Sequence, residues 1–101
     1  MNYILKYSTK AESEYFKAFD YYEEQSDGLG DRFEQSVGYK INQIVKNPYQ
    51  YSERRPHYRE CWVKDFPFLI VYKILAQKQI ILITSIFHTS RNPRKKFRKI
   101  N

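Results

Sequence analysis

The first half of the chain carries two stretches in which apolar residues recur at helical spacing. In the first stretch the spacing is four, three and four residues, at Ala11, Tyr15, Ala18 and Tyr22, with Phe19 alongside. Thr9 and Glu12 have the spacing of a capping box, in which each side chain satisfies a free amide of the other residue, so a helix is predicted to begin there. Gly28 and Gly30 allow the left-handed backbone that ends helices, which predicts that this helix stops near Asp27.

The second stretch is predicted to be a helix from Gly30 or Asp31 to the Asn47-Pro48 pair. Asp31 and Glu34 suit its start, because acidic residues are favoured near the positive end of the helix dipole. The apolar face is formed by Phe33, Val37, Ile41, Ile44 and Val45. Two helices joined by so few residues must run antiparallel, and their apolar stripes need a common surface to cover.

The remaining apolar runs have the length and composition of β-strands. Tyr3 to Tyr7 is a short β-prone segment, and Tyr49 to Pro56 is a polar, basic connection. Tyr58 to Val63 is predicted to be a strand, and Phe68 to Leu75 a nearly continuous apolar strand of the kind buried on both faces. Ile80 to Phe87, rich in isoleucine, is predicted to lie at or near the centre of the sheet.

The predicted order is therefore β-α-α-β-β-β, an α+β fold in which a helical hairpin packs on an antiparallel-rich meander sheet. Residues 1–101 are enough for one domain and too few for two, so a single domain with a basic C-terminal tail at 91–101 is expected. The residues predicted to contribute to the core are Tyr15, Phe19, Phe33, Val37, Ile41, Ile70, Tyr72, Ile81 and Ile83.

Charge is distributed unevenly along the chain. Up to Asn47 there are six basic and eight acidic residues, a net charge of −2, whereas from Pro48 onward twelve basic residues face three acidic ones, a net charge of +9. A polyanionic partner is therefore expected to dock on the second half.

Composition also excludes several classes of protein. A single cysteine, Cys61, cannot form an internal disulfide, and with only His57 and His88 beside it there is no plausible zinc ligand set, so neither a metal nor a cofactor is expected. The first residues lack the apolar segment of a signal peptide, and no run approaches the ~20 apolar residues of a membrane helix. We expect a cytoplasmic protein without membrane contact.

Two basic clusters are candidates for binding a nucleic acid or another target. One is the tail, whose cations include Arg91, Arg94, Lys95, Lys96 and Arg98; the alternative is a solvated terminus that only aids solubility. The other comprises Arg54, Arg55 and Arg59, interleaved with Tyr51 and Tyr58, which could stack on bases. The alternative for Arg59 is an ion pair with a carboxylate such as Glu60 or one from a helix.

His88 ends the last strand three residues before Arg91, so an imidazole and a guanidinium could surround one phosphate. His88, Arg59 and Arg91 would then be the candidates for metal-free RNA cleavage, with a general base taking the 2′-hydroxyl proton and arginines stabilising charge on phosphorus. The alternative is that His88 only makes local hydrogen bonds. Cys61 has no activating neighbour in the sequence, which favours a buried structural role.

Recognisable motifs are spread over nearly the entire chain. They are Tyr21-Tyr22, Gly28-Leu29-Gly30 followed by Phe33, Ile44 with Asn47-Pro48, Tyr58-Arg59-Glu60-Cys61, Phe66-Pro67-Phe68-Leu69-Ile70-Val71-Tyr72 and His88-Thr89-Ser90-Arg91-Asn92-Pro93. In their order and spacing these motifs resemble the ParE/RelE superfamily of type II toxins. The resemblance implies a toxin embraced by a cognate acidic antitoxin through an extended segment. The free toxin would either poison DNA gyrase, as ParE toxins do, or cleave ribosome-bound mRNA, as RelE toxins do.

The details of the resemblance favour the gyrase-type toxin. Arg59 and Arg91 match basic positions of RelE-type nucleases, but Cys61 and Leu69 stand where such nucleases typically have lysine and arginine. An mRNA endoribonuclease remains the alternative, because some relatives in the RelE branch use a histidine near the C-terminus, as His88 is. A nucleic-acid-binding domain without toxicity would leave the resemblance unexplained.

Overall fold

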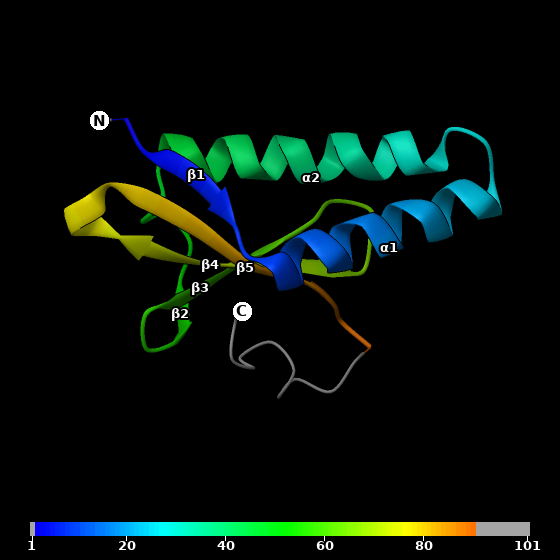
Figure 1. The fold of residues 1–101 in the computed structure, drawn as a ribbon. Helices are drawn as coiled ribbons and strands as arrows, with labels where there is room; N and C mark the ends of the chain where they lie inside the picture. The colour runs from blue at the N-terminus through cyan, green and yellow to red at the C-terminus, as the bar shows by residue number, and fades with distance from the viewer. Residues whose placement is uncertain (1, 91–101) are drawn as a thin grey trace.

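The computed structural model describes residues 2–90 and has two helices packed on a five-stranded sheet (Figure 1). In chain order the elements are β1 (Ile4–Tyr7), α1 (Thr9–Gln25), α2 (Leu29–Lys46), β2 (Glu53–Arg55), β3 (Tyr58–Trp62), β4 (Phe68–Leu75), a 3-10 turn (Ala76–Lys78) and β5 (Ile80–His88). The predicted α+β class and the helical hairpin on the sheet are confirmed. No helix among these residues is long and apolar enough to cross a membrane.

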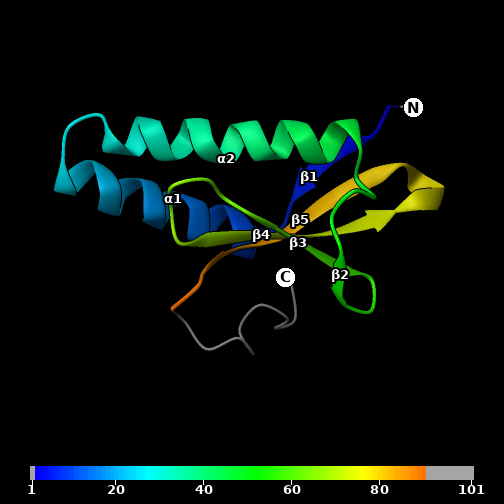
Figure 2. The ribbon, with the colours of Figure 1, turned by 180° about the vertical axis from the view of Figure 1, so that it is seen from behind.

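The sheet has the strand order β1-β5-β4-β3-β2. The β2-β3-β4-β5 part is an antiparallel meander, and β1 adds to it as a parallel partner of β5, from Ile4 opposite Ile80 to Tyr7 opposite Ile83. Both helices lie on one side of this sheet, and the same layering is seen from behind (Figure 2).

Strand β2 lies within the segment Tyr49 to Pro56, for which a plain connection was predicted, so that prediction was wrong. All three of its residues are exposed and charged, and they therefore carry no hydrophobic alternation that would signal a strand. Pairing with β3 creates the strand, through a tight turn in which His57 takes a positive φ of 72°.

The start of α1 also differs from the prediction. Ser8, not Thr9, is the capping residue, and its Oγ accepts a hydrogen bond from the Ala11 amide at 3.0 Å. The same hydroxyl donates to the Thr84 carbonyl at 3.0 Å, so Ser8 is buried between the helix and β5. This tertiary contact selects Ser8 over Thr9, which is the first helical residue.

The junction between the helices is built around Glu23. Its carboxylate accepts hydrogen bonds from the amides of Gly28 (3.1 Å) and Gly30 (3.0 Å). Gly28 takes the left-handed backbone (φ 86°) expected of it. Gly30 instead lies inside α2, where a Cβ would be 2.9 Å from Glu23 Oε1 and 3.1 Å from the Phe19 carbonyl oxygen, so this position requires glycine for close packing.

The core lies between the helices and the sheet. Of the predicted contributors, Phe33, Val37, Ile70, Tyr72, Ile81 and Ile83 are buried, and Tyr15, Phe19 and Ile41 are partly buried against them. Phe33 is fully buried, with ring centroids 5.1 to 5.7 Å from those of Tyr15, Tyr22, Phe66 and Phe68. A smaller cluster, Leu69, Val71 and Phe87 with Tyr58, shows that β4 is buried on both faces, as predicted.

Candidate functional site at the end of β5

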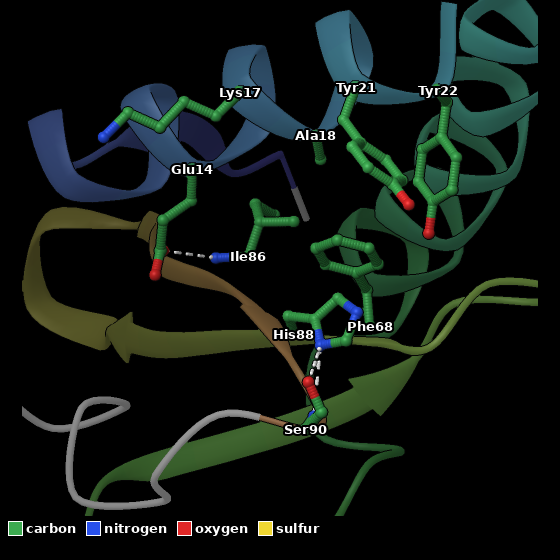
Figure 3. Close-up of a pocket in the computed structure, with 9 residues that line it drawn as sticks. All are labelled: Glu14, Lys17, Ala18, Tyr21, Tyr22, Phe68, Ile86, His88 and Ser90. Atoms are coloured by element: carbon green, nitrogen blue, oxygen red, sulfur yellow. Dashed lines mark hydrogen bonds between the residues drawn. The ribbon is translucent and has the colours of Figure 1, made fainter. Parts of the chain in front are cut away.

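His88 lies in a hollow of about 370 Å³ where the end of β5 meets α1 (Figure 3). Its ring packs edge-to-face on Phe68 at 5.0 Å between centroids, and the hollow is further lined by Lys17, Tyr21, Tyr22 and other residues of α1 and β5. Tyr21 is 58% exposed at the rim. The hollow therefore offers aromatic surface and few charges.

The hydrogen bonds of His88 define its tautomer. The Ser90 amide donates to Nδ1 at 3.1 Å, and the Ser90 hydroxyl lies 2.7 Å from the same nitrogen (Figure 3). Since Nδ1 accepts from an amide, the proton of the neutral ring is on Nε2. Nδ1, the nitrogen that could act as a general base, therefore already accepts a hydrogen bond from Ser90. Local hydrogen bonding of this kind is the alternative to catalysis that the sequence left open for His88.

Glu14 holds the end of β5 that carries His88. Beyond Tyr7 the strand β1 no longer pairs with β5, and the Glu14 carboxylate takes its place: Oε1 accepts from the Ile86 amide at 3.0 Å and from the Ser85 hydroxyl at 2.8 Å. Glu14 was not singled out from the sequence. Its position in the middle of a helix gives no signal that it contacts a strand more than 70 residues later.

Arg59 is engaged by the chain itself. Its Nη1 donates to the Tyr51 carbonyl at 2.6 Å and to the Tyr49 carbonyl at 3.4 Å, and its guanidinium lies 5.2 Å from the Tyr49 ring centroid. Nη2 forms an ion pair with Glu53 at 3.6 Å, and only 18% of the side chain is exposed. The carboxylate partner expected as the alternative to a functional role is present, but it is Glu53 of the neighbouring strand.

The strand register separates Arg59 from His88. Arg59 lies opposite Tyr72, whereas His88 lies opposite Phe68, four residues further along β4. Four residues of strand and two strand spacings place the two Cα atoms roughly 16 Å apart. The structure therefore does not bring these two candidates around one phosphate.

The other candidates are placed as follows. Arg54 and Arg55 lie on the edge strand β2. Arg91, Arg94, Lys95, Lys96 and Arg98 lie outside the described residues. Within residues 2–90 no three His, Cys, Asp or Glu side chains are grouped as metal ligands would be.

Cys61 faces the helices from β3 and is buried, as its predicted structural role requires. Burial raises the pKa of its thiol, although a hydrogen bond from Tyr51 and the nearby charge of Lys40 oppose that effect. The thiol therefore stays protonated near neutral pH and is a poor nucleophile.

The chain matches a known protein family over most of its length. The family model described as the ParE toxin of the type II toxin–antitoxin system parDE matches residues 5–93. A comparison with curated proteins gave no match.

Solved structures from ParDE and RelBE toxin–antitoxin systems have a similar fold. A chain of the chromosomal ParDE system from P. aeruginosa is 18% identical with a TM-score of 0.70, covering 85% of this chain and 95% of that one. A chain of the intact E. coli RelBE toxin–antitoxin complex is 15% identical with a TM-score of 0.65, covering 88% and 99%. A mutant of E. coli RelE bound to a peptide of its antitoxin is 17% identical with a TM-score of 0.64, covering 85% and 82%.

Proposed function

This chain belongs to the ParE toxins of type II toxin–antitoxin systems, and from that membership we propose that it inhibits growth by poisoning DNA gyrase. The observation that carries the proposal over an mRNA nuclease is the position of Arg59. Its guanidinium is held by the chain's own carbonyls, and its Cα atom lies roughly 16 Å from that of His88 across the sheet. A metal-free nuclease needs its base and its charge-stabilising groups around one phosphate.

The mRNA endoribonuclease is kept as the second candidate because of the hollow at His88. Tyr21 and Lys17 line the same hollow as that imidazole and supply a hydroxyl and a cation. For this activity His88 would have to release Ser90 from Nδ1 before it could accept a proton.

We also propose that an acidic antitoxin neutralises the toxin. The net charge of +9 after Pro48 favours a partner with acidic segments. Exposed aromatic side chains such as Phe16 (60%), Tyr21 (58%) and Trp62 (61%) give such a partner apolar surface to cover. The related RelBE and ParDE structures are of toxin–antitoxin systems.

The experiment that tests the gyrase proposal measures both kinds of damage in the same cells. The wild-type protein is induced, and double-strand DNA breaks and mRNA cleavage are assayed together; gyrase supercoiling is then assayed with the purified protein. Breaks with intact mRNA, and loss of supercoiling, are expected. Cleaved mRNA without breaks overturns the proposal.

Two variants of the toxin distinguish gyrase poisoning from mRNA cleavage further. His88→Ala should leave gyrase poisoning largely intact, whereas a nuclease should lose about 10²- to 10⁴-fold in rate without its proton-transfer group. Truncation after Ser90 removes six tail cations and should weaken target binding most at low salt. If no acidic protein co-purifies with the tagged toxin from cells that carry its native genes, that result would contradict the antitoxin proposal alone.

A further inference from the structure

A second hollow, of about 540 Å³, lies between α2 and the turn that joins β3 to β4. We call it the α2 groove. Arg32, Ser36 and Lys40 follow one another at four-residue steps on one face of α2, and Lys64 faces them from the turn. The other lining residues are Gln35, Tyr39, Asp65 and Phe66.

The charge of the α2 groove could not be read from the distribution of charge along the chain. Arg32 and Lys40 belong to the half with a net charge of −2, and Lys64 to the half with +9. Three cations gather there beside one lining carboxylate, Asp65. Within residues 2–90 no ion pair within 4.0 Å occupies any of the three. Cations without a carboxylate partner around a hollow favour an anionic occupant.

The shape of the α2 groove favours a chain of phosphates over a single anion. Arg32 and Lys40 are eight residues apart on α2, which is about 12 Å along the helix axis. That separation exceeds the spacing of adjacent phosphates along one strand, so the two cations can contact different phosphates of the same backbone. Ser36, between them, and Gln35 provide uncharged donors for phosphate or sugar oxygens.

An exposed aromatic ring favours a single strand over a duplex or an acidic peptide. Tyr39 is 59% exposed on the wall of the α2 groove, and Lys40 Nζ lies 6.0 Å from its ring centroid. Cations combined with an exposed aromatic side chain are how proteins bind single strands without reading sequence, because every base can stack on a ring.

We propose that the α2 groove binds the sugar–phosphate backbone of a single-stranded nucleic acid, with Arg32, Lys40 and Lys64 on phosphates and Tyr39 under a base. The inference goes beyond gyrase poisoning and does not depend on it. The α2 groove is also separate from the hollow at His88, since the two share no lining residue.

The test measures the affinity of the full-length protein for a labelled single strand about 12 nucleotides long by fluorescence anisotropy, between about 50 and 200 mM salt. Arg32→Gln, Lys40→Gln and Lys64→Gln are combined in one groove variant. The matched control combines Lys6→Gln, Lys46→Gln and Lys78→Gln, which removes the same charge at exposed positions outside the groove. Both variants keep the tail, and both are checked for unchanged thermal unfolding.

The groove variant is expected to reduce the slope of log affinity against log salt by about 2, because each phosphate that a cation neutralises on a single strand contributes about 0.7 to that slope. The control should keep the slope of the wild type. Tyr39→Ala should weaken single-strand binding about 10-fold, whereas Tyr39→Phe keeps the ring and should bind as the wild type does.

DNA and RNA strands of one sequence are compared to distinguish the two sources of the backbone, and groove-dependent binding of either one supports the proposal. An equal reduction of slope in groove and control variants would refute it. Tighter groove-dependent binding of duplex, or of poly-glutamate in place of the single strand, would also refute it. Gyrase supercoiling, measured on the same proteins, tests the proposed function independently of these outcomes.

Discussion

Replacing Arg59 by alanine tests whether this side chain stabilises the fold or contacts a target. The guanidinium donates to the Tyr51 carbonyl at 2.6 Å and pairs with Glu53 at 3.6 Å, and the side chain is only 18% exposed. A hydrogen bond from a charged donor is worth about 1.5 to 3 kcal/mol, and an ion pair with a half-exposed partner adds at most ~1 kcal/mol. We expect Arg59→Ala to lower the free energy of unfolding by about 2 to 3 kcal/mol.

The assay is urea unfolding followed by far-UV circular dichroism, with thermal unfolding in parallel. A loss of this size lowers the midpoint of thermal unfolding by about 10 to 20 °C in a domain of this length. Arg54→Ala is the matched control: it removes the same group from an exposed position of β2, and its effect should stay within ~0.5 kcal/mol.

Two results would refute this reasoning. If Arg59→Ala and Arg54→Ala unfold at the same urea concentration, the contacts of Arg59 do not stabilise the fold. The second result concerns toxicity. If Arg59→Ala fails to inhibit growth even at a low temperature at which the variant is fully folded, Arg59 acts on the target directly, as the nuclease hypothesis requires.

Three further perturbations test other contacts of the fold. Glu14→Ala leaves the Ile86 amide without its acceptor and should cost about 2 to 3 kcal/mol, with faster hydrogen exchange at Ile86; unchanged exchange would contradict the role of Glu14 as a strand partner. Phe33→Ala empties the centre of the aromatic cluster and should cost about 3 to 5 kcal/mol in urea unfolding, with Phe33→Leu clearly milder. Burial raises the pKa of Tyr51 to about 12 and that of Tyr72 further, so the folded state disfavours both phenolates. The contribution of these two tyrosines to stability should therefore be constant well below pH 10, the usual pKa of tyrosine, and fall as the pH rises from there toward 12; Tyr51→Phe should reduce that fall, and an identical pH profile would count against it.

The sequence by itself determined the elements whose signal is local. The two helices were predicted from their apolar stripes, the second of which ends at the Asn47-Pro48 pair. Strands β3 to β5 and most core residues were predicted from apolar runs, such as that of β4 and the isoleucines of β5. A helix and a strand each bury side chains with their own period along the chain, so the pattern of apolar residues within one segment is enough to identify the element. The superfamily could likewise be identified from motifs that lie in order along the chain.

Only the tertiary structure decided which residues meet across the fold. Strand β2 exists because β3 pairs with it, and Ser8 replaces Thr9 as the helix cap because Thr84 is within reach of its hydroxyl.

The candidate site depended on the fold in the same way. The strand register moved Arg59 away from His88, and packing brought Glu14 to Ile86 across 72 residues. Packing also brought the cations of α2 to Lys64. Hydrogen bonds and charges act over a few ångströms whatever their separation along the chain, so a pattern read along the sequence contains the partners of a side chain only when those partners are its neighbours in the same element.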